Sequence, residues 1–320
     1  MKFNQLEDSI KNSKKILIVS HINPDGDALG STSAMYNAIY DNFKKKADML
    51  VVGHFPNLYR FLPNIENAIL KFDDSMVYDL VITLDVAALD RLSAAQILFD
   101  KAKYTINIDH HKTNNEFGNI NIVSAQSSST GELLLSIFNE LEWKISLETA
   151  IGLYTAILTD TGGFKYENTS ENVFHSAAQL VKIGINPNKI YKNCYESKSK
   201  NFVMFQNYCI NKAVFENNDS IAYTTLYKRD FERFNGEEDF TEGLVESLRA
   251  IETTDIAFIA KEIDSKTTKI SMRSKQADVA KICSAFGGGG HTFAAGCTIK
   301  TGVDSAVKRV LNIIKETING

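Results

Sequence analysis

The segment His21-x-x-x-Asp25-x-Asp27 has the residue types best suited to chemistry. It places one imidazole and two carboxylates on a turn that directly follows the apolar run 15–20. Carboxylate and imidazole ligands without a thiolate favour a cation such as Mn²⁺ or Mg²⁺ over a structural zinc ion. An Asp-rich turn that caps the following helix has the same composition, so this segment alone fits a helix cap as well as a metal site.

Other acids and histidines stand at comparable places. Asp85 ends the apolar run 78–85, and Asp109-His110-His111 ends the run 104–109. Asp160 follows an apolar helical stretch, where the negative end of the helix dipole would favour a cation. A carboxylate at that place is easier to explain if a metal ion compensates its charge. A polar strand end and a buried, hydrogen-bonded His pair are the simpler alternatives, but together the segments favour one polar site.

The elements that must position these residues are the short apolar runs 15–20, 48–53, 78–85 and 104–109. Helix-length stretches separate them, and a helix is expected at about 28–40. This alternation is typical of an α/β domain with a largely parallel sheet and helices on both faces. Polar groups at the carboxyl ends of parallel strands converge on one crevice, so the sequence predicts that the candidate residues meet there.

Beyond Asn119 the pattern becomes helical, with helices expected to begin at Thr130 and Ser146. A break at 185–188 and a Lys-rich stretch at 191–201 indicate a domain boundary. The boundaries expected are a first domain at 1–187, a linker at 188–212 and a second domain at 213–320. The second domain should be a smaller α/β unit, with strands at 220–226, 256–263 and 269–273, a helix at 278–285, a Gly-rich loop, a last strand and a helix from about Val303.

The Gly-rich loop is the most informative part of the second domain. Four consecutive glycines, 287–290, precede His291. Glycines let backbone N–H groups approach a phosphate closely, and His291 could add a donor, so Gly288, Gly289 and Gly290 are candidate substrate ligands. A flexible loop is the simpler alternative. Arg273, at the end of a predicted strand, could bind a phosphate or could be a solvated surface charge.

Composition limits the class of protein. The chain has 320 residues, 44% of them hydrophobic and 23% charged, which is typical of a globular protein of about two domains. The formal net charge of -4 argues against binding of long nucleic acid by non-specific charge, but it allows a small phosphorylated substrate. No apolar run approaches the roughly 20 residues of a membrane span, and residues 1–15 do not resemble a signal peptide.

The four cysteines, Cys194, Cys209, Cys283 and Cys297, form no C-x-x-C pair. We therefore expect free thiols and a cytoplasmic location, and neither a disulfide nor a zinc site.

Taken together, these motifs resemble those of the DHH phosphoesterase superfamily, which is named for the signature seen here as Asp109-His110-His111. His21-x-x-x-Asp25-x-Asp27 is similar to its first motif, Asp85 to its second and Asp160 to its fourth. The segment 286–296 resembles the signature of the DHHA1 domain that accompanies this catalytic core. The resemblance covers nearly the whole chain and is nearest to the bifunctional oligoribonuclease and pAp phosphatase group.

The resemblance implies two Mn²⁺ ions, with Mg²⁺ as a substitute. One ion would be held by His21, Asp25 and Asp85, and the other by Asp27, Asp85, His110 and Asp160, so that Asp85 bridges them. His111, Arg273 and His291 would stabilise charge on the phosphoryl oxygens, whereas Asp109 would orient a histidine. The DHH domain would bind the metals and the DHHA1 domain the substrate, with the active site in the interdomain cleft.

The activity implied is hydrolysis of very short oligoribonucleotides to mononucleotides and removal of the 3′-phosphate of pAp. A closed cleft would exclude long double-stranded nucleic acid, and no membrane partner is expected. The alternatives are a phosphodiesterase for cyclic or linear dinucleotides such as pApA or pGpG, an inorganic pyrophosphatase and a non-catalytic nucleic-acid-binding module. The apolar helix positions are compatible with a homodimer. Arg91, His54 and the segment 127–131 have no assigned role, and 127–131 fits a helix cap equally well.

Overall fold

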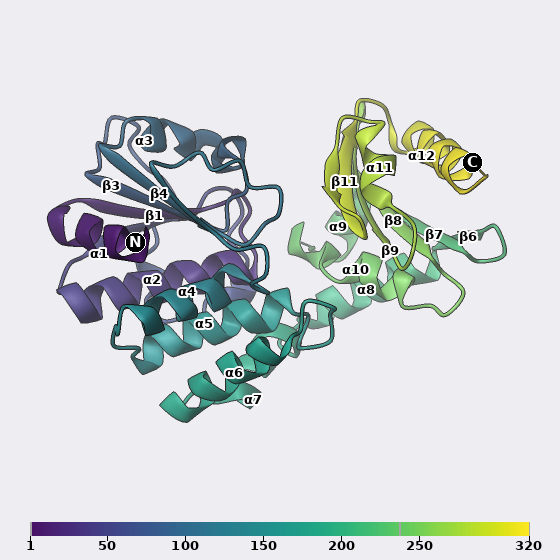
Figure 1. The fold of residues 1–320 in the computed structure, drawn as a ribbon. Helices are drawn as coiled ribbons and strands as arrows, with labels where there is room; N and C mark the ends of the chain where they lie inside the picture. The colour runs from purple at the N-terminus through teal and green to yellow at the C-terminus, as the bar shows by residue number, and fades with distance from the viewer. Residues whose placement is uncertain (1, 237, 320) are drawn as a thin grey trace. The chain divides into compact units, whose positions relative to one another are not determined.

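The computed structural model describes residues 2–236 and 238–319 (Figure 1). The chain divides into two compact units, and the boundary in the sequence falls between Ser197 and Lys198. The stretch 188–212, expected to be a linker, contains most of helix α7 (Pro187–Tyr195) in unit 1 and helix α8 (Lys200–Asn211) in unit 2. Among the described residues, no helix is both long and apolar enough to cross a membrane.

Unit 1 is built on a parallel sheet whose strand order is β2-β1-β3-β4-β5. The strands are β1 (Ile16–Ser20), β2 (Ala47–Leu50), β3 (Leu80–Leu84), β4 (Tyr104–Asp109) and β5 (Ile120–Val123). Strands β1 and β3 are buried along their whole length, which explains their unbroken apolar sequence. The expectation that the chain is helical beyond Asn119 was wrong, because β5 comes first. This four-residue strand lies at the sheet edge and is only half-buried, so its sequence pattern is short and weak.

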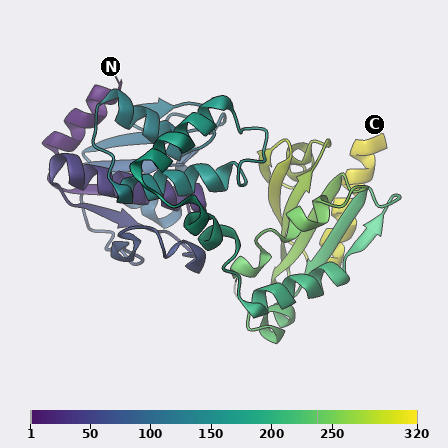
Figure 2. The same ribbon diagram turned by 90° about the horizontal axis from the view of Figure 1, so that it is seen from below.

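Helices cover both faces of this sheet. The helices of unit 1 are α1 (Lys2–Asn12), α2 (Gly26–Phe43), α3 (Gln96–Asp100), α4 (Thr130–Glu140), α5 (Leu147–Asp160), α6 (Glu171–Ile183) and α7, with short 3-10 turns at Asn57–Tyr59, Ile65–Asn67 and Leu89–Ala95. Of these, α6 and α7 pack against α5. Helices α2, α4 and α5 lie on one face and α3 on the other (Figures 1 and 2). Alternate residues of β1 supply the two cores, since Ile16 and Ile18 pack with Leu29 while Leu17 and Val19 pack with Leu98.

Helices α2 and α5 approach so closely that glycine is required where they cross. A Cβ on Gly30 would lie 2.6 Å from the carbonyl oxygen of Gly152, and a Cβ on Gly152 would lie 2.7 Å from that of Gly30. A Cβ on Gly26 would likewise meet the side chain of Thr159 at 2.4 Å. The helices therefore run antiparallel, and the start of α2 lies against the end of α5. This packing brings the first Asp-rich segment close to Asp160.

Unit 2 contains a six-stranded mixed sheet in the order β10-β11-β9-β8-β7-β6. The strands are β6 (Val214–Glu216), β7 (Ile221–Leu226), β8 (Ile256–Asp264), β9 (Thr267–Ser274), β10 (Gly289–His291) and β11 (Ala294–Ile299), and only β7 and β8 pair in parallel. The helices are α8, α9 (Lys228–Arg233), α10 (Leu244–Arg249), α11 (Val279–Ser284) and α12 (Val303–Asn319), with a 3-10 turn at Glu238–Thr241. The predicted fold class, a parallel-sheet α/β domain followed by a smaller α/β domain, is confirmed.

The Gly-rich segment is only partly the loop that we expected. Gly289, Gly290 and His291 form the edge strand β10, which pairs antiparallel with β11. A Cβ on Gly288 would lie 2.3 Å from the carbonyl oxygen of Gly296, and one on Gly290 would lie 2.4 Å from that of Ala294. Close approach to β11 therefore accounts for two of the glycines, whereas a Cβ on Gly289 would meet nothing within 4 Å.

Candidate functional site

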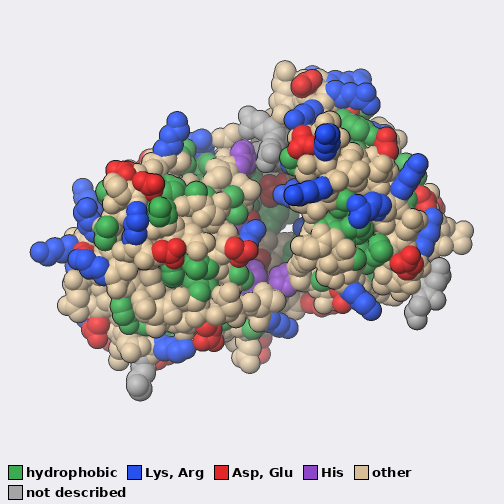
Figure 3. All heavy atoms as spheres, turned by 90° about the horizontal axis from the view of Figure 1, so that it is seen from above, with side chains coloured by type: hydrophobic (Ala, Val, Ile, Leu, Met, Phe, Trp, Pro, Cys, Tyr) green, Lys and Arg blue, Asp and Glu red, His purple; other side chains and the backbone are tan. Residues whose placement is uncertain are grey.

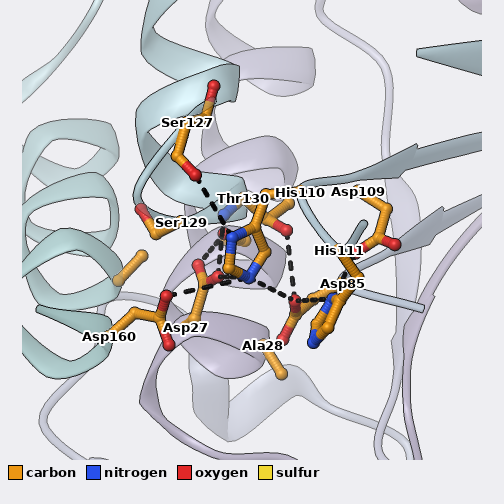
Figure 4. Close-up of polar contacts among 12 residues, drawn as sticks. Asp27, Ala28, Asp85, Asp109, His110, His111, Ser127, Ser129, Thr130 and Asp160 are labelled. Carbon is orange, nitrogen blue, oxygen red and sulfur yellow. Dashed lines mark hydrogen bonds and ion pairs between the residues drawn. The ribbon is translucent and has the colours of Figure 1, made fainter. Parts of the chain in front are cut away.

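The predicted metal ligands meet beyond the carboxyl ends of the strands of unit 1, and most of them are drawn in Figure 4. Their ligand atoms form three overlapping groups, each within 4.8 Å: His21, Asp25 and Asp85; Asp27, His110 and Asp160; and Asp85, His110 and His111. Asp85 therefore belongs to two groups, each with a different histidine partner. All six residues that we expected to hold metal are present in these groups, together with His111.

Asp25 serves as the N-cap of α2, and it also faces the site. Its Oδ1 accepts hydrogen bonds from the backbone N–H groups of Asp27 and Ala28, both at 3.1 Å. The same oxygen lies 4.0 Å from Nε2 of His21. The two interpretations of this segment are therefore compatible, because one carboxylate caps the helix and reaches the neighbouring imidazole.

Asp27 is buried and is held by the start of α4. Its Oδ2 accepts from the N–H of Thr130 at 2.7 Å, and its Oδ1 accepts from the N–H of Gly131 at 3.0 Å and from the hydroxyl of Ser31 at 3.0 Å. The segment 127–131 is thus part of the site as well as a helix cap, in which Ser129 accepts from the N–H of Glu132. Sequence reasoning left this role open, because a capping pattern does not show what the free N–H groups of the first turn bind.

Asp85 lies at the centre of the cluster and has unusual backbone geometry. Its φ of 61° is in the left-handed region, which non-glycine residues adopt rarely and which is often found at functional sites. Its Oδ1 accepts from the hydroxyl of Thr130 at 3.2 Å. Its oxygens also lie 3.5 Å from Nε2 of His21 and 3.6 Å from Nε2 of His110.

The adjacent histidines have different surroundings. Nε2 of His110 lies within 3.6–3.8 Å of oxygens of Asp27, Asp85 and Asp160. His111 instead donates from Nδ1 to Oδ1 of Asp109 at 2.8 Å, and the same nitrogen lies 3.5 Å from Asp85. His110 therefore faces the acids, while His111 is oriented by one buried carboxylate.

Asp109 supports the site from behind. It is fully buried at the end of β4, and its Oδ2 accepts from the side-chain amide of Asn114 at 2.6 Å. It belongs to none of the three groups of candidate ligands found among the described residues. A carboxylate that fixes the orientation of a neighbouring imidazole is a common partner of a metal or phosphate site.

Two histidines are positioned to act as metal ligands through Nε2. Nδ1 of His21 donates to the carbonyl oxygen of Ile22 at 2.9 Å, and Nδ1 of His110 donates to that of Ser127 at 3.3 Å. Each neutral ring can then direct a lone pair on Nε2 to a cation that lies between this nitrogen and the carboxylates. The Nε2-to-oxygen separations of 3.5–4.0 Å exceed ordinary hydrogen-bond lengths, so there is room for a cation between these atoms.

The electrostatics of the cluster also fit a divalent cation. Burial raises the pKa of Asp27 well above its ordinary value, and the charge of Asp85 raises it further. Burial, followed by the charges of Asp25 and Asp85, likewise raises the pKa of Asp160. Converging buried carboxylates repel one another, and a bound cation would relieve that repulsion. The oxygen and imidazole donors suit Mn²⁺ or Mg²⁺.

The histidines compensate part of this negative charge. Burial lowers the pKa of His21, but the nearby carboxylates of Asp85 and Asp25 outweigh that effect and raise the pKa to about 9. The pKa of His111 is also raised to about 9, because Asp109 and Asp85 outweigh the effect of burial. Burial would raise the pKa of Asp85, but the nearby imidazoles, His21 foremost, hold it well below its ordinary value.

Two residues without an assigned role lie close to the site. The guanidinium of Arg91 is 3.3 Å from Nδ1 of His21, and its backbone carbonyl accepts from the N–H of Ile22 at 2.8 Å. The backbone N–H of His54 donates to the side chain of Asn23 at 2.8 Å. The spacing of Arg91 from Asp85 was the signal available in the sequence, but a surface arginine at a helix start has the same spacing.

In unit 2, Arg273 and His291 occupy one level of the sheet. Ala294 of β11 pairs with Arg273 of β9 on one side and with His291 of β10 on the other. Directly paired residues place their side chains on the same face, so a small alanine separates these two polar residues. Nε of Arg273 also forms an ion pair at 2.8 Å with Glu246 on α10.

The surface charge shows no long basic stripe on the face in view. Lys and Arg side chains are interspersed with Asp and Glu side chains over both units in Figure 3. Long nucleic acid held by its backbone needs clustered positive charge. This face therefore does not have the charge distribution of a long-duplex binder.

Comparison with known proteins identifies both units. Residues 15–157 match the DHH family, N-terminal domain, and residues 218–320 match the DHHA1 domain. A relative from Thermus thermophilus named bifunctional oligoribonuclease and PAP phosphatase NrnA is 28% identical, covering 95% of this chain and 90% of that protein. A relative of the same name from Bacillus subtilis is 25% identical, covering 89% of each.

A solved structure is also similar over almost the whole chain. It is described as an exopolyphosphatase-related protein from Bacteroides fragilis, and it is 27% identical to this chain. The TM-score is 0.91, with 98% of this chain and 96% of that chain covered. The similarity therefore includes both the DHH and DHHA1 portions.

Proposed function

Because this chain belongs to the DHH phosphoesterases and carries a DHHA1 domain, we propose that it hydrolyses very short oligoribonucleotides to mononucleotides and removes the 3′-phosphate of pAp. The observation that carries this proposal is the convergence of candidate ligands from separate segments of unit 1. The relatives named oligoribonuclease and PAP phosphatase, which match at least 89% of the chain, support the choice of substrate.

We propose that two Mn²⁺ ions bind here, with Mg²⁺ as a substitute. The first would be held by His21, Asp25 and Asp85, and the second by Asp27, Asp85, His110 and Asp160. Bound divalent ions would stabilise negative charge on the phosphoryl oxygens. They would also lower the pKa of a bound water molecule towards neutral pH, which makes it a better nucleophile. Backbone N–H groups at the start of α2 hold the carboxylate of Asp25 in place. Those at the start of α4 hold the carboxylate of Asp27.

The remaining residues would orient the substrate and stabilise its charge. Asp109 orients His111 through Nδ1, so a charged ring would donate from Nε2–H to a phosphoryl oxygen. Arg273, His291 and the N–H groups of Gly288, Gly289 and Gly290 are proposed to bind phosphate from the DHHA1 domain. Hydrolysis adds water across the P–O bond, so that one product carries the phosphate and the other a hydroxyl group.

The short length of the substrate is supported by charge. The formal net charge is -4, and acidic and basic side chains are interspersed on the visible face. Such a protein lacks the charge surplus that retains long RNA, whereas a local metal site is sufficient for a few phosphates. We also propose a cytoplasmic location, since the four cysteines are buried and form no disulfide among the described residues.

A substrate series would test this function. With Mn²⁺ present, we expect the chain to release mononucleotides from di- to pentanucleotides and phosphate from pAp, while inorganic pyrophosphate and long duplex RNA remain largely intact. Each substrate would be incubated under identical conditions and the products separated by chromatography. Rapid cleavage of pyrophosphate without turnover of pAp or any short RNA would contradict the proposal.

A further inference from the structure

Exposed aromatic side chains gather just beyond the candidate metal ligand Asp160. Tyr166 is 40% exposed and Tyr191 on α7 is 42% exposed, although tyrosine rings are usually covered more fully. The metal site and the residues proposed to bind phosphate leave these rings without a role. A cluster of exposed apolar surface beside a functional site commonly marks a binding surface.

The two rings lie against a pair of glycines in the same loop. Gly162 and Gly163 have φ values of 59° and 74°. A Cβ on Gly162 would be 2.4 Å from Cζ of Tyr166, and one on Gly163 would be 3.6 Å from Cε2 of Tyr191. We call this surface, formed by Tyr166 and Tyr191 against Gly162-Gly163, the aromatic shelf.

Contacts with the end of α5 hold the aromatic shelf in place. Tyr191 packs against Tyr195 with ring centroids 4.9 Å apart, and the Tyr195 hydroxyl donates to the carbonyl oxygen of Leu158 at 3.2 Å. The backbone N–H of Tyr166 donates to the carbonyl oxygen of Thr161 at 3.1 Å. These contacts connect the rings to the last turn of α5, which also carries Asp160, so the shelf is preorganised relative to the metal site.

The loop is also attached to the site on its other side. The side-chain amide of Asn168 donates to the carbonyl oxygens of Asp160 at 3.1 Å and Ser128 at 3.0 Å. Gly162 is two residues after Asp160, so their Cα atoms are at most about 7 Å apart. The shelf is therefore continuous with the site at which a phosphodiester would be cleaved.

We propose that the aromatic shelf stacks a nucleobase of the substrate. This inference rests on the proposed function and adds to it a means of holding a base. Lys165 precedes Tyr166, and its Nζ lies 5.7 Å from the centroid of the Tyr166 ring, so a cation also lies at the shelf. The two aromatic rings would supply stacking, which accepts any base.

Steady-state kinetics on the dinucleotide pApA would test the shelf. Tyr166→Ala and Tyr191→Ala are expected to raise KM by about fivefold or more, with kcat changed less than about twofold, because stacking is lost while the metal ligands stay in place. Tyr166→Phe and Tyr191→Phe keep the ring and should match the unaltered chain. The KM ratio should be the same at low and moderate salt, since stacking is not a charge interaction.

Abasic dinucleotides identify the group that stacks. One analogue lacks the 5′ base of pApA and the other lacks the 3′ base. Removing the base that occupies the shelf should raise KM for the unaltered chain, and Tyr166→Ala should then add nothing further, as expected for two changes that remove the same contact. Tyr40→Ala, which removes a 50% exposed tyrosine from α2, is the matched control and should leave KM unchanged.

The outcomes separate the two proposals. If the unaltered chain hydrolyses pApA but both alanine variants keep its KM, the aromatic shelf does not stack a base. The same conclusion follows if the alanine variants lower kcat alone, or if Tyr166→Ala raises KM equally on pApA and on both abasic analogues. If the unaltered chain hydrolyses neither pApA nor pAp, it is the proposed function that fails.

Discussion

The candidate residues of unit 1 and those of unit 2 are positioned in opposite ways. In unit 1, the single carboxylate of Asp27 accepts hydrogen bonds from two backbone N–H groups and a hydroxyl, and it is almost completely buried. In unit 2, Arg273 and His291 lie on antiparallel strands of a mixed sheet, and an ion pair with Glu246 engages the arginine Nε. Buried, multiply bonded carboxylates keep a fixed geometry, whereas a partly exposed arginine on a long side chain can adapt to its ligand.

This difference indicates a division of work between the two regions. A metal site needs fixed distances, and the strand ends and helix starts of unit 1 supply them. A substrate-binding side chain must extend to its ligand, and a change in one of its contacts reduces activity less than a change in the metal site does. Substitutions in unit 1 should therefore affect catalysis itself, whereas those in unit 2 should mainly affect substrate binding.

The largest effect is expected at Asp85. Asp85→Asn keeps the size of the side chain and tolerates the left-handed backbone, but it removes the charge shared by two candidate ligand groups. We expect hydrolysis of every substrate to fall by a factor on the order of 10⁴ or more, as when a central catalytic group is lost. Turnover numbers on pAp and pApA, together with Mn²⁺ content after dialysis, would measure this effect.

Asp79→Asn is a matched control for Asp85→Asn. Asp79 precedes the same strand at its other end and pairs with Lys103 at 2.7 Å. The Asp79→Asn substitution should leave activity and metal content unchanged. Near-normal turnover by Asp85→Asn would show that unit 1 does not contain the catalytic metal site.

The sequence predicted the convergence of the candidate residues in unit 1 better than the contacts that hold them in place. His21, Asp85 and the Asp-His-His segment follow strands whose carboxyl ends must meet, so their convergence follows from the topology of a parallel sheet. The hydrogen bonds from Thr130 and Gly131 to Asp27 could not be predicted in this way, because they depend on how α4 packs against α2. The contact of Arg91 with His21 depends on a 3-10 turn that has no strong periodicity.

The fold shows the same limit. The long buried strands and amphipathic helices were predictable, whereas β5 and β10 were not. Strand β5 has four residues at a sheet edge, and β10 has three, two of which are glycines with low strand propensity. Pairing with a neighbouring strand stabilises each of them, and a local sequence pattern contains no information on that pairing.

A smaller effect is expected at Arg273. Arg273→Ala should raise KM for pAp and pApA by about 10- to 100-fold, because one charge-assisted phosphate contact is lost, and it should leave Mn²⁺ binding intact. Arg273→Lys should recover part of the loss, since lysine keeps the charge but not the paired donors. A fall in kcat comparable to that of Asp85→Asn would remove the distinction between the two units.

Glu246→Gln sharpens the same comparison. Glu246 holds Nε of Arg273 at 2.8 Å, so its charge competes with a phosphate for the guanidinium while it also orients the side chain. If competition dominates, KM should fall by a few fold, as expected for a partly exposed ion pair of modest strength. An increase in KM would instead identify Glu246 as a positioning residue for Arg273.

The smallest effects on activity are expected at the glycines of unit 2, where two explanations of the Gly-rich segment can be separated. Gly288→Ala would place a Cβ 2.3 Å from the carbonyl oxygen of Gly296 and should destabilise unit 2 by about 1–3 kcal/mol. The Cβ added by Gly289→Ala would meet nothing within 4 Å, so the thermal unfolding of this variant should be unchanged.

If the exposed N–H groups of this segment bind phosphate, Gly289→Ala should still raise KM for pAp by a few fold, because the methyl group limits the approach of the substrate. Calorimetry and kinetics on the two variants would distinguish close packing from phosphate binding. An unchanged KM in Gly289→Ala would leave packing against β11 as the reason for Gly288 and Gly290.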